Sequence, residues 1–277
     1  MSTQNALLTI LVEKINNDTL VLPTLPAIAL KVRQAADDPN INLNAMADVV
    51  GQVPSLCARM VKIANSAYLG RTVKVTSTSQ AVTRIGLSQV KNIATALAME
   101  QLFVSKNEIV KAYMTSKWAS TVNMVGNAMA AMTYYKKMTK DKKLSLDTMT
   151  LAGLVADIGA LPVLTEAERH DSVFANPTFL DVAIDKLSGR IGGSIMREWQ
   201  FNDIFIGVAE HWRDLEHTSP DVDYIDFVRI GAALTNNIDK ADDVLAAAQA
   251  RGIFSDISEL QSPEFCELRD NAKAIFA

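Results

Sequence analysis

Few side chains in this 277-residue sequence could do chemistry, and the most conspicuous is a single carboxylate, Asp157. It lies within residues 151–162, which are otherwise apolar or small, and no other ionisable residue occurs between Asp147 and Glu166. A buried carboxylate without a partner costs several kcal/mol. Asp157 is therefore expected either to be held by hydrogen bonds or ion pairs in a core, or to bind a ligand or a metal.

The other residues typical of catalytic sites are sparse. His170 and His217 lie in polar stretches that predict exposed turns. His211 ends an apolar segment, so it is either a core or edge residue or a ligand. The sequence has no Gly-rich phosphate loop, no GxSxG elbow and no HExxH motif. Cys57 and Cys266 form neither a CxxC metal motif nor a disulfide framework, which fits a reducing compartment.

A second group of candidates lies in a basic segment. No acidic residue occurs between Val49 and Met99, whereas six bases do: Arg59, Lys62, Arg71, Lys74, Arg84 and Lys91. The segment could present a face that attracts anions, although solvated helix faces are the commoner explanation. Asn65 and Ser66 lie at a predicted helix end in the same segment. They either cap the helix and tie a loop, or form a ligand or partner site beside Arg59, Lys62 and Arg71.

The composition restricts the class of protein. Hydrophobic residues make up 49% of the chain and charged residues 21%, which predicts a packed core and excludes global disorder. Aromatic residues are scarce at 6%, a balance that favours close-packed helices over a sheet sandwich. The net charge of −4 argues against nucleic acid as the main partner. No signal peptide is recognisable, and the stretch that comes nearest to a membrane span, residues 144–164, is interrupted by Asp147, Asp157 and glycines, which is typical of a core segment. A cytoplasmic protein without a membrane partner is therefore expected.

Hydrophobic periodicity predicts helices along the whole chain and no strand of useful length, so the expected fold class is all-α. A short helix over 5–16 and five helices within residues 20–103 are expected, followed by a long amphipathic helix over 108–135. A central helix over 147–161 is expected to end at Pro162, because proline lacks an N–H. Further helices are predicted over 178–187, 189–199, 203–213, 222–238, 241–251 and 263–275. In the central helix, Gly153 and Gly159 make sense if another element approaches closely.

Several of these features, taken in order, resemble the HDOD domain, the "HD-related output domain" of bacterial signalling proteins. They are Leu22-Pro-Thr-Leu-Pro26, Asp37-Asp-Pro39, Pro54 with Leu56, Ile63-Ala-Asn-Ser-Ala67, Gln80-Ala-Val82 and Ile85-Gly-Leu87. The resemblance continues more loosely to about residue 240, through Lys117-Trp118, residues 153–161, and residues 191–211. It implies an N-terminal five-helix subdomain packed on a degenerate HD-like helical subdomain.

HDOD domains are related to the HD phosphohydrolases, which hold metals with histidines and aspartates, and this chain departs from that ligand set. The positions that correspond to the metal site carry Ser120, Ala156, Asp157, His211 and Trp212. Of these, Asp157 and His211 alone could bind a metal, whereas a catalytic metal needs about three protein ligands and an open position. The resemblance therefore implies no catalytic residue, no metal and no cofactor. Asp157 is instead expected to be held by neighbouring helices, with Ser120, Thr121 or His211 as partners.

These observations predict a domain division and a function. We expect an N-terminal helix in residues 1–19, the N-terminal part of the HDOD domain in 20–105, its degenerate HD-like part in 106–240, and a helical tail in 241–277. The resemblance implies a non-catalytic signalling or scaffold module of a bacterium that stands alone and binds a protein partner in trans. A metal-dependent phosphohydrolase acting on a nucleotide or cyclic dinucleotide is one alternative, and nucleotide or nucleic-acid binding on the basic segment is another. Homodimer formation is left open.

Overall fold

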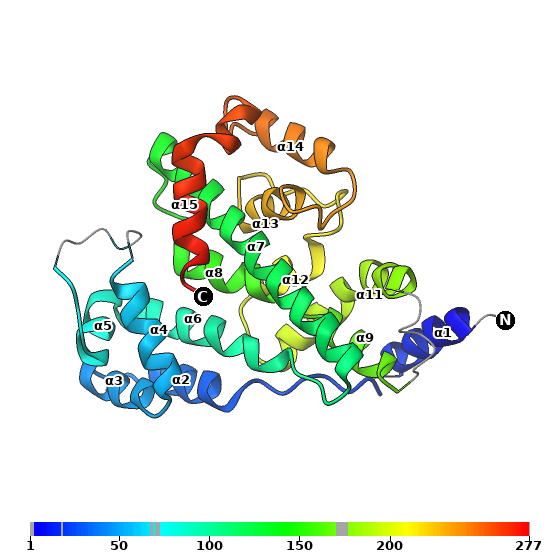
Figure 1. Ribbon diagram of the computed structural model, residues 1–277, viewed down its shortest axis with the longest axis horizontal. Helices are drawn as coiled ribbons and strands as arrows, with labels where there is room; N and C mark the ends of the chain where they lie inside the picture. Colours follow the sequence, from blue (N-terminus) through cyan, green and yellow to red (C-terminus); the bar gives the residue numbers. More distant parts are fainter. Residues whose placement is uncertain (1–2, 18, 67–68, 70–72, 170–176, 277) are drawn as a thin grey trace.

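The protein is described here by a computed structural model covering residues 3–17, 19–66, 69, 73–169 and 177–276. Over these residues it consists of helices joined by loops, without a strand, which confirms the all-α prediction (Figure 1). Two groups of helices lie side by side, and the segment that leads into the first group runs along the base of the second (Figure 1).

The first group is built from short helices whose ends follow local capping rules. After α1 (Thr3–Asn16), it contains α2 (Ala27–Asp37), α3 (Leu43–Gly51), α4 (Pro54–Ala64), α5 (Thr78–Ile85) and α6 (Leu87–Ala98), with a 3-10 turn at Met99–Leu102. The Asn42 side chain caps α3 and the Ser77 side chain caps α5. Pro54 begins α4, where its missing N–H costs nothing. Gly86 separates α5 from α6 with a φ of 91°, a conformation that favours glycine.

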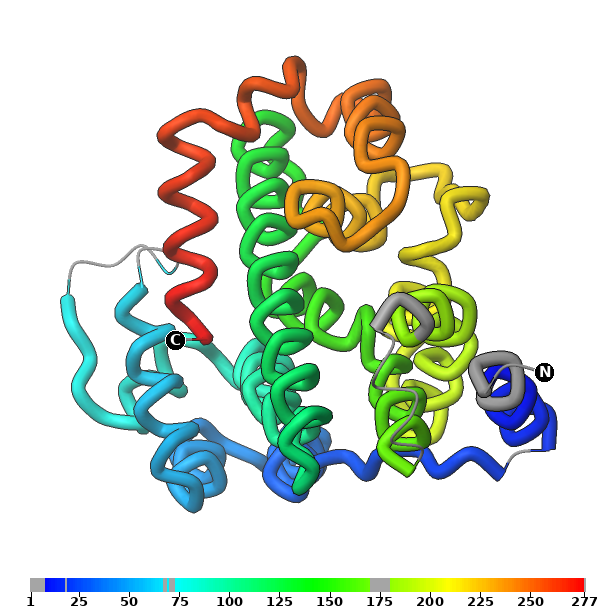
Figure 2. The backbone as a smooth tube through the Cα atoms, turned by 45° about the vertical axis from the view of Figure 1, so that its right-hand side comes forward, coloured from blue at the N-terminus to red at the C-terminus, as the bar shows by residue number. Residues whose placement is uncertain are grey.

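The second group is organised around one long helix, α7 (Glu108–Thr139). The other helices are α8 (Leu146–Val155), α9 (Ala160–Ala167), α11 (Pro177–Glu198), α12 (Asp203–His211), α13 (Tyr224–Ala233), α14 (Ala241–Ala250) and α15 (Pro263–Lys273), with a 3-10 helix at Ile257–Gln261. Both α13 and α15 pack along α7, and Figure 2 shows α15 in red beside it. Phe265 and Phe276 are buried there, so the tail is part of the core.

Two helix predictions were wrong, and both corrections bear on Asp157. The predicted central helix is two helices, α8 and α9, separated by a turn over residues 156–159. Pro162 does not end a helix. It is the third residue of α9, within the first turn, where backbone N–H groups have no intrahelical acceptor. Asp157 therefore lies in the turn between two helices rather than on a helix face.

The second correction concerns the two helices predicted over 178–187 and 189–199, which form the single helix α11. A glycine inside a helix costs about 1 kcal/mol relative to alanine. Here it allows close packing: a Cβ on Gly189 would lie 2.6 Å from the carbonyl oxygen of Glu210, and one on Gly159 would lie 1.9 Å from the carbonyl oxygen of Ser188. The close approach expected around Gly159 is thus confirmed, and its neighbour is the backbone of α11.

Polar contacts and one cation–π pair join the two groups. The Trp199 indole N–H donates to the Pro23 carbonyl at 3.0 Å, and the Arg33 guanidinium lies 3.8 Å above the Phe201 ring. Asn92 donates to the Asp147 carboxylate at 2.7 Å, where α6 packs on α8. The first group is therefore packed directly on the second.

The segment Leu146–Ala167 is long and apolar enough to cross a bilayer, with a mean hydropathy of 1.5. It forms α8, the turn and α9, and 89% of its apolar window is buried in the fold. Such burial is typical of core helices, and it explains why the stretch around Asp157 is so apolar.

Candidate functional site

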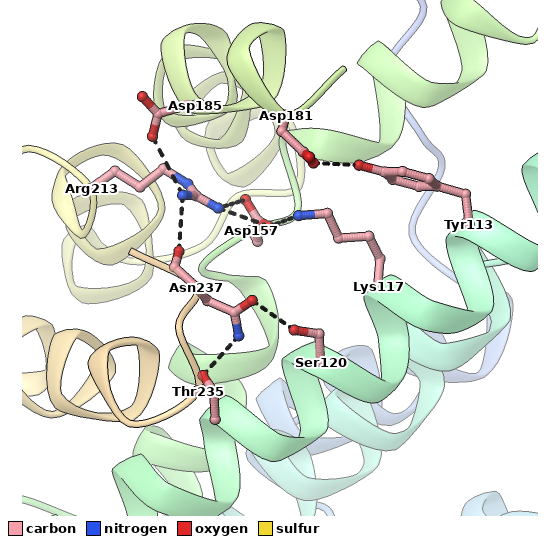
Figure 3. A network of polar contacts seen from close by, with 9 residues as sticks. All are labelled: Tyr113, Lys117, Ser120, Asp157, Asp181, Asp185, Arg213, Thr235 and Asn237. Carbon is pink, nitrogen blue, oxygen red and sulfur yellow. Dashed lines mark hydrogen bonds and ion pairs between the residues drawn. The ribbon is translucent and has the colours of Figure 1, made fainter. Parts of the chain in front are cut away.

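Asp157 lies where the α8–α9 turn meets α7, α11 and the end of α12 (Figure 3). The residue is 8% exposed, and its turn is fixed by the Ala160 N–H, which donates to the Asp157 carbonyl at 3.0 Å. Ala156, beside it, is fully buried. The carboxylate is therefore largely removed from water and must be stabilised by neighbouring side chains.

Two cations from different elements provide that stabilisation. Nη2 of Arg213 donates to Oδ1 and Oδ2 of Asp157, each at 3.2 Å, and Nζ of Lys117 on α7 lies 3.7 Å from Oδ2. The Arg213 and Lys117 side chains are 14% and 21% exposed. Ion pairs this well shielded are screened by solvent much less than surface pairs.

Arg213 is the centre of a wider network. Its Nη1 donates to the Asn237 carbonyl at 3.3 Å and lies 3.5 Å from the Asp185 carboxylate on α11. Its guanidinium lies 4.0 Å from the centroid of the Trp212 ring. The Asn237 side chain then accepts a hydrogen bond from Ser120 on α7 at 2.7 Å (Figure 3). Arg213 thereby ties the end of α12 to the α8–α9 turn, α11 and the loop after α13.

This arrangement does not fit a metal ion. Both oxygens of Asp157 accept from Arg213, and Lys117 adds a second positive charge to the same carboxylate. A divalent cation there would face two fixed cations and one carboxylate, whereas a catalytic metal needs about three donors. Across the described residues, no group of three His, Cys, Asp or Glu side chains is placed to hold a metal.

The partners expected for Asp157 were wrong. Ser120 bonds to Asn237, and Thr121 is buried on α7. His211 is 37% exposed and stacks on His217, with ring centroids 4.0 Å apart and an interplanar angle of 5°. A buried carboxylate is better stabilised by full positive charges.

Of the other positions that the resemblance relates to a metal site, Trp212 is buried at 1% exposure, and its ring packs on Arg213. The structure therefore brings Ser120, Ala156, Asp157 and Trp212 into one region. His211 lies at its edge, turned towards His217 and Glu210.

Asn65 and Ser66 have clear local partners. The Asn65 side chain accepts from the Val75 N–H and donates to the Val75 carbonyl, both at 2.8 Å. The Ser66 hydroxyl donates to the Ile63 carbonyl at 2.7 Å. These bonds close the loop between α4 and α5, which is the structural role considered for the pair.

The basic segment is largely occupied by internal contacts. Arg59 pairs with Glu100 at 2.6 Å, Arg84 donates to the Ala64 and Val73 carbonyls, and Lys91 pairs with Asp37. Lys62 is exposed on α4, and Arg71 lies outside the described residues. These contacts weaken the case for an anion-binding face.

The residues that sequence reasoning missed are Arg213 and Lys117. Each adjoins a tryptophan of a resembling motif, Trp212 and Trp118, and that position was the available signal. An isolated buried carboxylate predicts a cation partner. Sequence alone could not choose which of the 27 lysines and arginines provides it.

Tyr113, on α7 near this network, gives the stability of the protein a dependence on pH. Its hydroxyl donates to Asp181 at 2.6 Å (Figure 3). Partial burial, together with the Asp181 carboxylate, raises the pKa of Tyr113 above its ordinary value near 10. The folded state then keeps the phenolic proton longer than the unfolded chain does, so this contribution to stability is lost as pH rises above about 10.

Tyr113→Phe is therefore expected to be less stable than wild type at neutral pH but to lose less stability at alkaline pH. Urea unfolding of the wild type and the variant at about pH 8 and about pH 11 measures how much stability each protein loses between the two pH values. Parallel pH dependences for the variant and the wild type would contradict the assignment.

Comparison with known proteins agrees with this description. The family model of the HDOD domain matches residues 22–214. A crystal structure named "Putative metal-dependent phosphohydrolase" from Shewanella amazonensis SB2B is 38% identical to the chain, with 100% of both chains covered and a TM-score of 0.93.

More distant structures share the fold. An HDOD domain protein with unknown function from Geobacter sulfurreducens is 18% identical, with 99% of this chain and 98% of that chain covered and a TM-score of 0.61. A structure named "Putative signal transduction protein" from Marinobacter aquaeolei VT8 is 21% identical, with 99% of this chain and 65% of that chain covered and a TM-score of 0.62.

A curated but uncharacterized protein of Treponema pallidum is 22% identical over 207 residues. The match covers 71% of this chain and spans 38% of the length of that relative. The family match spans more than half of the chain, and the all-helical fold is shared with the HDOD domain protein of Geobacter sulfurreducens. The chain belongs to the HDOD family.

Proposed function

We propose that this HDOD protein is a non-catalytic module of bacterial signal transduction that binds a protein partner in trans. The observation that carries the proposal is the state of Asp157. The carboxylate that would bind a metal in an HD phosphohydrolase is neutralised by Arg213 and Lys117. The site that would activate water is thereby converted into a joint between helices.

Loss of the ligand set argues against hydrolysis on chemical grounds. A metal that generates hydroxide needs several donors and an open coordination position. Here the neighbouring position holds Ala156, and the end of α12 supplies Arg213 and a buried Trp212. The network has the composition of a buried ion-pair cluster that stabilises the fold.

A surface groove of about 690 Å³ supports the binding role. It lies between the chain segment that precedes α2, α2 itself and the end of α11. Leu30 on its wall is 45% exposed, and nearby Val21 is 68% exposed. Polar residues also line the groove: Arg33, Gln34, Asp37, Glu198 and Gln200. Apolar anchors surrounded by polar residues are typical of protein-binding surfaces.

Replacing Leu30 by aspartate is expected to weaken partner binding at least tenfold, because a charge would lie in the apolar part of the interface. Ile257→Asp is the matched control, since Ile257 is 46% exposed and lies in the 3-10 helix before α15. Affinity capture from the native bacterium, followed by binding measurements on each captured protein, provides the readout. Capture that is equal in the two variants would contradict this location.

The name of the Shewanella relative makes metal-dependent phosphohydrolysis the alternative to test. Protein purified without chelator is expected to contain well below one equivalent of iron, manganese or zinc. It should also not hydrolyse a phosphodiester above the rate in buffer. Stoichiometric metal that is lost in Asp157→Asn, together with turnover, would overturn the non-catalytic proposal.

A further inference from the structure

A second hollow lies at the joint between the two helix groups and shares no lining residue with the groove beside Leu30. Its volume is about 350 Å³, within the range of small-ligand cavities. One polar lining residue, Thr150, is buried, and its hydroxyl donates to the Leu146 carbonyl. The other buried lining residues are apolar, and each is less than a tenth exposed: Ile63, Ile85, Ile93, Leu144 and Ile275. Small-molecule sites are typically concave and mostly apolar with a few polar groups, and this hollow has that composition.

The exposed side of this cavity is polar and carries two lysines. Lys142 is exposed and makes no ion pair with the described residues. Lys136, at the end of α7, is half-buried and donates to the Leu144 carbonyl, which leaves further N–H donors on its ammonium group. One acid, Asp147, also lines the cavity, but its carboxylate accepts from Asn92. The charge facing the hollow is therefore net positive.

From this combination we propose that the cavity binds a small amphiphilic acid, such as an alkyl carboxylate. The alkyl chain would contact the isoleucine wall, where burial of each methylene is favourable. The carboxylate would meet Lys136 and Lys142, which are suited to charge-assisted hydrogen bonds. This inference does not depend on the proposed protein partner.

The origin of the lining residues gives such a ligand a structural effect. Ile63, Ile85 and Ile93 belong to the first helix group, whereas Lys136 and Leu144 belong to the second, and Ile275 follows α15. A ligand in the hollow would contact both helix groups and Ile275 after α15 at the same time. Because it would bind the packed state and not the unfolded chain, it should raise the thermal stability of the whole protein.

The test is calorimetric titration of the full chain with octanoate and decanoate below their micelle concentrations, paired with decylamine and decanol. Decanoate is expected to bind saturably, to raise Tm, and to bind at least tenfold more tightly than decylamine. Lys142→Gln should weaken decanoate about threefold to tenfold. Lys143→Gln is the matched control and should change nothing, because Lys143 is 84% exposed and faces Asp221.

The second part of the test uses a variant whose larger side chain fills the hollow. Ile93→Trp is expected to abolish decanoate binding while circular dichroism shows a folded protein. If that core substitution unfolds the chain, Gln89→Trp on the exposed side replaces it, with the same expectation. Equal affinity for decanoate and decylamine, wild-type affinity in Lys142→Gln, or no saturable binding to the wild type would each overturn the proposal.

Discussion

Replacing Arg213 by methionine should lower the free energy of unfolding by about 3 kcal/mol, the lower end of the range for removing one partner of a buried ion pair. Methionine retains most of the apolar contact with Trp212 but leaves Asp157 without its closest cation. Lys117, 3.7 Å away, would compensate in part, which is why the lower end is expected. Urea denaturation with unchanged m-value is the measurement.

The matched control for this substitution is Arg197→Met. Arg197 also pairs with a carboxylate, at 2.5 Å from Glu210, but its side chain is 54% exposed. An exposed pair contributes at most about 1 kcal/mol. If the two variants lost the same stability, burial would not be what makes the Asp157 pair important.

A double-mutant cycle separates the pair from other effects of the substitution. Asp157→Asn removes the charge that Arg213 neutralises, so the double variant should be more stable than the sum of the two single losses predicts. A coupling of about 1–3 kcal/mol is expected for groups in direct contact. Additive losses would mean that Arg213 acts through Asn237, Asp185 and Trp212 rather than through Asp157.

Gly159→Ala should lower the free energy of unfolding by about as much as Arg213→Met, about 3 kcal/mol, which is the upper end for overpacking. The added Cβ would lie 1.9 Å from the Ser188 carbonyl oxygen and 2.6 Å from the Gly192 nitrogen. Both atoms belong to the backbone of α11, so no side-chain rotation can relieve the clash. The α8–α9 turn would have to move away from α11, and Asp157 would move with it.

Alanine substitutions at two other glycines serve as comparisons for Gly159→Ala. At Gly207, in α12, a Cβ would meet nothing within 4 Å, so Gly207→Ala should stabilise the protein by about 0.5–1 kcal/mol. At Gly153 the contact is a side-chain atom, Cγ2 of Val125 at 2.8 Å, and an intermediate loss of about 1 kcal/mol is expected. Thermal or urea unfolding of the three variants should give this order. A neutral Gly159→Ala would contradict the close packing of the turn on α11.

The Arg213 and Gly159 substitutions both act on the residues around the α8–α9 turn. The absence of a Cβ on Gly159 allows the turn carrying Asp157 to pack closely against α11. Arg213 ties the same turn to the end of α12. A metal centre links helices through shared ligands, and here an ion pair provides that link. We expect substitutions at this site to change stability before they change binding at the groove beside Leu30.

The sequence by itself determined the fold class and the family. Helical periodicity is a local signal that acts within a few residues, and so are the caps that the structure places at Asn42 and Ser77 and the proline at the start of α4. The structural role considered for Asn65 also rested on local contacts, and its side chain does close the α4–α5 loop. Asp157 was identified as a buried charge because its neighbours in sequence are apolar.

Only the tertiary structure decided how that charge is stabilised and where the helices around it break. Lys117 lies 40 positions before Asp157 and Arg213 lies 56 after it, so no local pattern links them. The break between α8 and α9 and the continuity of α11 were both mispredicted. The break falls in the turn shortly before Pro162, whereas α11 continues through Gly189, where the missing Cβ leaves room for the carbonyl oxygen of Glu210. Helix propensities of residues other than proline differ by only about 1 kcal/mol, so tertiary packing can outweigh them. Local free energies specify the elements of this protein, and contacts between residues distant in sequence specify its site.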